Sequence, residues 1–146
     1  MNKITDIKKI IIVLVLVFLD QISKYFFYGK NIEIIKDIFI IKSSTNTGVI
    51  FGIFSGNFFI TIFLPLLIIA FLIYEYSEDR HISYLFIIVG LFGNLLDRII
   101  RGFVVDFIYI PVVEKYNIFL FNLADLYLVL GVILGLVYLI KKGHKK

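Results

Sequence analysis

The feature that most constrains this chain is a set of four long apolar stretches. Each has the length of about 20 residues that a helix needs to cross a hydrocarbon layer roughly 30 Å thick. Because the backbone groups of a segment in lipid must be paired within that segment, each stretch predicts a transmembrane helix. The four predicted spans are residues 10–28, 57–76, 82–100 and 121–140.

The composition and the connections between the spans agree with this interpretation. Hydrophobic residues make up 60% of the 146 residues, which is more than a typical soluble domain contains. The two longer connections, residues 29–56 and 101–120, carry strand-like sequence rich in Ile and Val. We therefore expect one integral membrane domain over residues 1–146, mainly α, with four transmembrane helices and a small extracytoplasmic β-sheet.

The distribution of basic residues predicts the orientation of the chain. Residues 1–9, 77–81 and 141–146 together carry eight Lys or Arg, whereas residues 29–56 and 101–120 carry five. By the positive-inside rule both termini are expected in the cytoplasm, with the two longer connections outside. Because these basic residues flank the spans, no nucleic-acid partner is expected.

Several chemistries are excluded by the residue types present. The chain has no cysteine, which removes thiol nucleophiles and zinc–thiolate sites. The two histidines, His81 and His144, fall in the predicted cytoplasmic segments, away from the other polar clusters, so a serine–histidine triad is not expected. No metal-binding motif is present, and no metal or organic cofactor is expected. Carboxylates with amide and guanidinium partners remain.

Two carboxylates stand where apolar stretches meet polar sequence. Asp106 follows the third span in the sequence VVDF, and Asp125 opens the fourth in FNLAD. If these spans are antiparallel helices, both side chains lie at the same face of the membrane. Two carboxylates that share a site hold one proton between them, and can activate a water while protonating a carbonyl oxygen or a leaving amine. A helix N-terminus favours the ionised form of Asp125, so Asp106 is predicted to carry the proton.

Asp125 also admits a purely structural interpretation. Asn122 is a good N-cap residue, and Asp125 then falls at the third helical position, as in a capping box. Asp125 would in that case only cap a helix and complement its dipole.

Other polar residues form pairs at helical spacing. Asp20 and Lys24 lie four residues apart, and they either face the interior of the bundle or form an interfacial pair that only fixes the helix position. Asp97 and Arg101 have the spacing of a simple pair on a helix surface. Arg98 lies on one face with Asn94 and can donate to a backbone carbonyl or to a carboxylate.

Four motifs together resemble those of one family. They are LDQISK (Leu19–Lys24), NTGVIFG (Asn46–Gly52), GNLLDR with GFVVDF (Gly93–Phe107) and FNLAD (Phe121–Asp125). In order and spacing they resemble lipoprotein signal peptidase, also called signal peptidase II, a bacterial intramembrane aspartyl protease. The resemblance implies four helices with an extracytoplasmic β-cradle, and a catalytic pair formed by Asp106 and Asp125. It also implies a set of residues that shape or line the site: Asp20, Lys24, Asn46, Gly48, Gly90, Asn94, Asp97, Arg98 and Asn122.

The resemblance further implies a substrate and a location. The reaction expected is that of an aspartic endopeptidase, which removes the signal peptide from a diacylglyceryl-modified prolipoprotein by cutting before the lipidated cysteine. The enzyme is expected as a multi-pass monomer in the bacterial plasma membrane, in contact with membrane lipid, with its active site at the extracytoplasmic face. The cyclic peptide globomycin is the expected inhibitor.

Two interpretations from other classes stay open at the level of sequence. A small four-helix proton-coupled transporter would keep a carboxylate near the middle of the membrane, where Asp20 is the one candidate. A structural or assembly protein would carry the polar residues as unrelated interface contacts.

Overall fold

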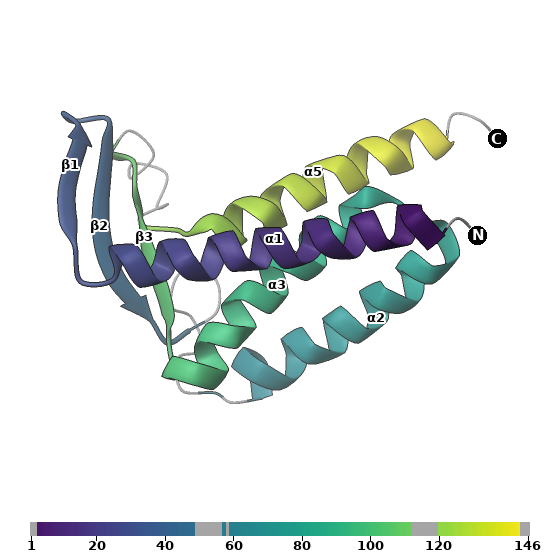
Figure 1. Cartoon of the computed structure of the whole chain (residues 1–146), viewed down its shortest axis with the longest axis horizontal. Coiled ribbons are helices and arrows are strands. Elements are labelled where there is room, and N and C mark those ends of the chain that lie inside the picture. The colour runs from purple at the N-terminus through teal and green to yellow at the C-terminus, as the bar shows by residue number, and fades with distance from the viewer. Residues whose placement is uncertain (1–2, 49–56, 58, 112–119, 144–146) are drawn as a thin grey trace.

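The computed structural model describes residues 3–48, 57, 59–111 and 120–143 (Figure 1). The helices are α1 (Lys3–Phe27), the π-helical turn η1 (Phe59–Phe63), α2 (Leu64–Asp79), α3 (Ile82–Arg101) and α5 (Leu123–Gly143). The strands are β1 (Asn31–Ile35), β2 (Phe39–Asn46) and β3 (Val104–Tyr109). Within the described residues, four helical segments are long and apolar enough to cross a membrane, which confirms the predicted fold class of four such helices with a small sheet.

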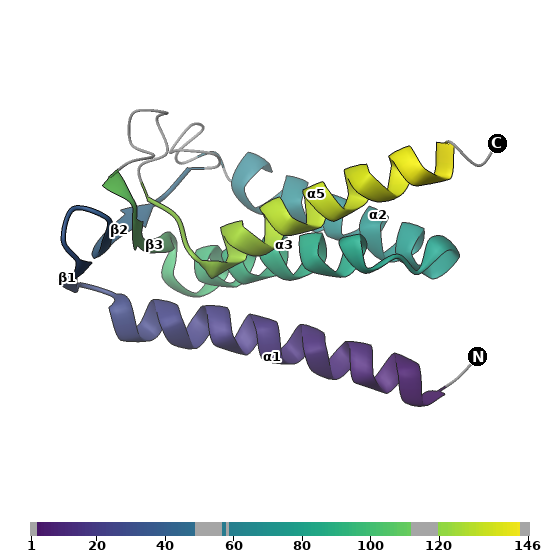
Figure 2. The same ribbon diagram turned by 90° about the horizontal axis from the view of Figure 1, so that it is seen from above.

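The sheet and the chain termini lie at opposite ends of the helical bundle (Figure 1). Seen from above, α1 runs along one side of the group formed by α2, α3 and α5 (Figure 2). It contacts both α3 and α5, and α3 and α5 also pack against each other. Any group placed where α1, α3 and α5 meet the sheet is therefore covered on several sides.

The outward faces of the helices are apolar. Phe18 of α1 is 61% exposed, Ile100 of α3 is 70% exposed and Leu139 of α5 is 61% exposed. A water-soluble bundle would bury side chains of this size, whereas a bundle surrounded by lipid presents them to the acyl chains. This surface fits a polytopic membrane protein.

The beginning of the second membrane-spanning segment differs from the sequence expectation. The sequence predicts one continuous helix over residues 57–76, but a π-helical turn, η1, precedes α2. Pro65 lies in the first turn of α2, directly after η1, and its missing backbone N–H coincides with the change from π-helical to α-helical structure. The proline therefore marks the start of the regular helix rather than an interruption within it.

The three strands form an antiparallel sheet in the order β1-β2-β3. Its buried core consists of Ile41, Val105, Phe107 and Ile108. The register of β2 on β3 places Ser44 opposite Asp106 and Asn46 opposite Val104, so the end of β2 lies beside the start of β3. The remaining parts of the two predicted extracytoplasmic connections, residues 49–56 and 112–119, lie outside the described residues.

Glycines allow α3 and α5 to approach closely. A Cβ atom added to Gly90 would lie 2.4 Å from the carbonyl oxygen of Ala124, and one added to Gly131 would lie 2.8 Å from the backbone nitrogen of Ile87. Contacts this short leave no room for any side chain. The first turn of α5 is consequently held directly against α3, in the manner of small-residue packing between membrane helices.

Candidate active site

Asp125 is held at the start of α5 by a reciprocal pair of hydrogen bonds with Asn122. The Asn122 Oδ1 atom accepts from the backbone N–H of Asp125 at 3.1 Å, and the backbone N–H of Asn122 donates to Asp125 Oδ2 at 3.0 Å. This is the capping box that the sequence predicts. The second carboxylate oxygen, Oδ1, accepts from Asn94 Nδ2 at 2.8 Å. Capping therefore occupies one oxygen of Asp125, while the other faces α3.

Asp106 reaches the same region through a tight reversal of the chain. Helix α3 is capped by Gly102, whose φ of 79° is favourable for glycine and whose N–H donates to the carbonyl of Arg98 at 3.1 Å. Strand β3 then runs back along the end of the bundle and presents Asp106. Its carboxylate accepts from Asn122 Nδ2 at 2.7 Å and from Asn46 Nδ2 at 3.1 Å.

Asn122 is the residue that joins the two aspartates. Its side-chain amide donates to Asp106 and its backbone N–H donates to Asp125. The same amide also donates to Asn94 Oδ1 at 3.1 Å. The two carboxylates that are distant in sequence thus lie on either side of one asparagine.

The surroundings of Asp106 favour its protonated form. Burial, together with the nearby carboxylate of Asp125, raises the pKa of Asp106 from 3.8 to about 6. Hydrogen bonds from Asn46 and Asn122 act in the opposite direction and limit the rise in its pKa. A carboxyl group with this pKa holds its proton in mildly acidic solution, which fits the predicted role of proton carrier.

The turn after β2 is fixed from two directions. The N–H of Gly48 donates to Asn46 Oδ1 at 2.9 Å, so the amide nitrogen of Asn46 is directed to Asp106. Arg98 donates through Nη2 to the carbonyl of Gly48 at 2.5 Å and through Nη1 to the carbonyl of Asn94 at 3.3 Å. Of the two acceptor types predicted for Arg98, the structure has the backbone carbonyl.

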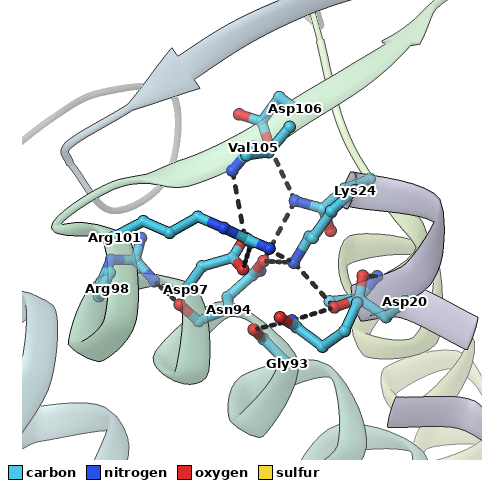
Figure 3. Close-up of polar contacts among 12 residues, drawn as sticks. Asp20, Lys24, Gly93, Asn94, Asp97, Arg98, Arg101, Val105 and Asp106 are labelled. Atoms are coloured by element: carbon cyan, nitrogen blue, oxygen red, sulfur yellow. Dashed lines mark hydrogen bonds and ion pairs between the residues drawn. The ribbon is translucent and has the colours of Figure 1, made fainter. Parts of the chain in front are cut away.

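A buried ionic cluster near Asp106 joins α1 to α3 (Figure 3). The Lys24 ammonium contacts Asp20 Oδ2 at 2.8 Å and Asp97 Oδ2 at 3.2 Å, and all three side chains are fully buried. The interfacial alternative for the pair of Asp20 and Lys24 is therefore wrong. The predicted pair of Asp97 and Arg101 forms, but Asp97 is not on a surface because α1 places Lys24 against it.

Asp20 also connects α1 to the first turn of α5. Its Oδ1 atom accepts from the backbone N–H of Ala124 at 2.9 Å. Gln21 donates to the carbonyl of Gly93 at 3.0 Å, and a Cβ atom at Gly93 would lie 2.6 Å from Asp20 Oδ2. Gln21 and Gly93 lie in the motifs LDQISK and GNLLDR, but the sequence predicted no role for either in this junction. The available signal for Gln21 was a polar residue next to Asp20 within an apolar span.

The opposite end of the bundle carries a separate polar contact. His81 caps α3 there and stacks on the ring of Tyr138, with the two ring centroids 4.0 Å apart. Among the residues with described placement, no three His, Cys, Asp or Glu side chains are grouped to hold a metal ion.

Taken together, the residues singled out in the sequence form one connected cluster where α1, α3, α5, β2 and β3 meet. Gly90 belongs to it through its contact with Ala124, next to Asp125. A pair of aspartates held by amide donors at one end of a transmembrane helical bundle is the arrangement of an intramembrane aspartic peptidase.

Comparison with known proteins gives the particular family. The family model described as "Signal peptidase (SPase) II" matches residues 12–141. A lipoprotein signal peptidase of Clostridium novyi (strain NT) is 35% identical, with 92% of this chain and 99% of the relative covered. One from Staphylococcus aureus (strain JH9) is 34% identical, with 94% and 90% covered. The chain belongs to the signal peptidase II family.

Solved structures agree with this assignment. A bacterial membrane enzyme determined by the in meso method at 2.3 Å resolution superposes with a TM-score of 0.86 at 31% identity, covering 95% of this chain and 91% of that one. A second, determined at 1.9 Å, gives a TM-score of 0.81, also at 31% identity, with 92% and 93% covered. The family and the enzyme class predicted from the motifs are confirmed, and the transporter alternative finds no support.

Proposed function

We propose that this protein is the aspartic endopeptidase that removes signal peptides from prolipoproteins, with Asp106 and Asp125 as its catalytic residues. Its membership of the signal peptidase II family supplies the reaction. The observation that supports the choice of residues is the position of Asn122, which donates to both carboxylates. Two acids held on one asparagine can share a proton and act on a single water.

The proposed hydrolysis proceeds in two balanced steps. Ionised Asp125 accepts a proton from a water whose oxygen attacks the scissile carbonyl carbon, while protonated Asp106 donates its proton to the carbonyl oxygen. In the tetrahedral diol that results, Asp125 returns its proton to the amide nitrogen as the C–N bond breaks. Asp106 recovers a proton from a diol hydroxyl as the new carboxyl forms. The pair ends each cycle with the proton distribution it had at the start.

The amide donors around the pair serve this mechanism by holding the carboxylates in place. Asn46 and Asn122 fix the two oxygens of Asp106, and Asn94 fixes the free oxygen of Asp125. Because these partners are already oriented, the side chains do not have to reorient as charge moves between the two carboxylates during the reaction. In the proposal, Arg98 and Gly48 support the same region by fixing the turn after β2.

The substrate is proposed to be a diacylglyceryl-modified prolipoprotein, cut just before its lipidated cysteine. The apolar outer faces of the helices suit a signal helix and two acyl chains that remain in the membrane. Globomycin, a cyclic peptide, is proposed to inhibit by lying across the two aspartates. The enzyme is proposed to act as a monomer formed by a single membrane domain over residues 1–146.

The proposed orientation in the plasma membrane has both termini in the cytoplasm and the aspartates at the extracytoplasmic face. The excess of basic residues on the terminal side supports this orientation. Asp106 on β3 and Asp125 in the first turn of α5 lie at the sheet end, opposite the termini (Figure 1), and in the proposal the cleavage region of an exported precursor emerges there.

The experiment that tests this function measures cleavage of a lipidated prolipoprotein by purified protein in detergent. Asp106→Asn and Asp125→Asn keep the shape and one acceptor oxygen but replace the other oxygen by an NH2 group and remove the titrating proton. Both variants are expected to fold and to lose cleavage, whereas Asp79→Asn, at the other end of the bundle, is expected to cut like wild type. If a folded Asp125→Asn variant cuts at a rate near that of wild type, Asp125 is only a helix cap and the mechanism is wrong.

A further inference from the structure

The ammonium group of Lys24 is the one fully buried cation that the proposed hydrolysis leaves unused among the described residues. It has three partners: Asp20 at 2.8 Å, Asp97 at 3.2 Å and the Oδ1 atom of Asn94 at 3.0 Å (Figure 3). The first two contacts neutralise its charge. The third connects it to the aspartate pair through a single amide.

Lys24 fixes which way the amide of Asn94 points, together with Asn122, whose side-chain amide donates to the same oxygen. An ammonium group has only donors, so it accepts no hydrogen bond from the amide nitrogen and requires the amide oxygen. Asn94 Oδ1 is directed to Lys24 and to Asn122, and Nδ2 is left to donate to Asp125 Oδ1 at 2.8 Å. With the amide reversed, an oxygen would face the carboxylate of Asp125 and a nitrogen would face the ammonium.

The charge of Lys24 also bears on the number of protons in the cluster. Within the described residues, three cations (Lys24, Arg98 and Arg101) surround four carboxylates (Asp20, Asp97, Asp106 and Asp125). In a medium of low polarity a neutral cluster is favoured, and one proton on the carboxylates makes this cluster neutral. Lys24 also lowers the pKa of Asp106, against the effect of burial.

We propose that Lys24 is a positioning residue for signal-peptide hydrolysis: it orients the Asn94 amide toward Asp125, and its charge holds the aspartate pair at one shared proton. This inference rests on the proposed catalytic roles of Asp106 and Asp125. Lys24 acts on the two aspartates through Asn94 and does not contact the substrate.

The test compares two buried variants. Lys24→Met alone would leave Asp20 without its cation, and an unpaired buried charge prevents many proteins from folding. Lys24→Met is therefore combined with Asp20→Asn, whose amide oxygen still accepts from the N–H of Ala124. Asp20→Asn alone is the reference, so that the difference between the two variants reports Lys24.

The matched control is Arg101→Met. It also removes a cation from Asp97, but Arg101 contacts Asp97 without bonding to Asn94. All variants are assayed with a lipidated prolipoprotein across a range of pH, and their folding is monitored by thermal melting in the same detergent.

Relative to Asp20→Asn, the double variant is expected to lose about 10- to 100-fold in kcat, a part of the 10²–10⁴-fold that general acid–base catalysis contributes. Its KM is expected to change little, and both limbs of its pH profile are expected to move to higher pH, because loss of a nearby positive charge strengthens proton binding to the pair. Arg101→Met is expected to move the pH profile much less, because Arg101 is partly exposed to solvent and contacts Asp97 without a bond to Asn94.

A purely structural role for Lys24 predicts a lower melting temperature with an unmoved pH profile, and that result in the folded double variant overturns the proposal. An equal shift in Arg101→Met overturns it as well. If the double variant does not fold, Lys24→Gln replaces it, because glutamine keeps an N–H donor for Asn94 and removes the charge; an unmoved profile then refutes the role of the charge. A failure of the proposed function gives a different result. In that case either wild type does not cleave the prolipoprotein, or the Asp106→Asn and Asp125→Asn variants do cleave it.

Discussion

Gly90→Ala provides the sharpest perturbation of the candidate site, because it adds one methyl group behind Asp125. The new Cβ atom would lie 2.4 Å from the carbonyl oxygen of Ala124 and 2.5 Å from Leu128 Cγ. The first of these is backbone, which no change of rotamer moves aside. Ordinary contact begins at 3.4 Å, so the first turn of α5 must move by about 1 Å away from α3.

This displacement has a predicted cost in both stability and rate. Overpacking of this kind costs about 1–3 kcal/mol, of which up to about 1 kcal/mol is offset because alanine favours a helix over glycine. Asp125 moves with the turn, and a misplacement of about 1 Å in a catalytic group lowers the rate by about 100-fold. The expected result is a folded, slightly less stable enzyme with a large loss of kcat.

Two other glycines on the same interface supply matched controls. Gly135→Ala places its Cβ 3.6 Å from Ser83 Cβ, in ordinary contact, and is expected to leave both stability and cleavage near those of wild type. Gly131→Ala is nearly as crowded as Gly90→Ala, with Ile87 N at 2.8 Å, but Gly131 lies about 9 Å along α5 from Asp125 at about 1.5 Å per residue. It is expected to lower stability with a much smaller loss of kcat.

The assay combines thermal melting in detergent with cleavage of a lipidated prolipoprotein. The reasoning is refuted if Gly90→Ala cleaves at the rate of wild type, or if Gly131→Ala and Gly90→Ala lose kcat equally. In the second case the loss follows the packing of the whole interface and not the position of Asp125.

Three further predictions concern the titration and support of Asp106. Because burial raises its pKa to about 6, kcat/KM is expected to fall as the pH rises through about 6, and a profile that is flat between pH 5 and pH 7 would contradict its role as proton carrier. The folded state binds this proton more tightly than the unfolded chain, so the stability of wild type should decrease relative to Asp106→Asn as the pH rises from about 4 to about 6; melting temperatures of the two proteins that run parallel over this interval would refute the shift. Asn122→Ala removes a helix cap worth about 1 kcal/mol together with a hydrogen bond that lowers the pKa of Asp106, so a lower melting temperature and a pH–rate limb moved to higher pH are expected. A variant that loses stability but keeps the limb in place would show that Asn122 is only a cap.

The features determined by the sequence itself are those that depend on short spacing along the chain. Four apolar stretches of membrane length require helices, because lipid offers the backbone no other partner. Within a helix, residues three or four apart are neighbours by geometry alone. The capping box of Asn122 and Asp125 and the pair of Asp20 and Lys24 could therefore be predicted, and both form.

The tertiary structure decided which of these local groups meet. Nothing in the spacing of Asp97 indicates that α1 brings Lys24 onto it, so the sequence placed that carboxylate on a surface where the fold buries it. Likewise, the hydrogen bonds of Asp106 depend on the register of β3 and on the approach of α5 to α3. Hydrophobic periodicity gives the face of a helix but not its depth or its distance from a neighbour. Those are set by close packing at glycines such as Gly90, where a fraction of an ångström separates contact from overlap.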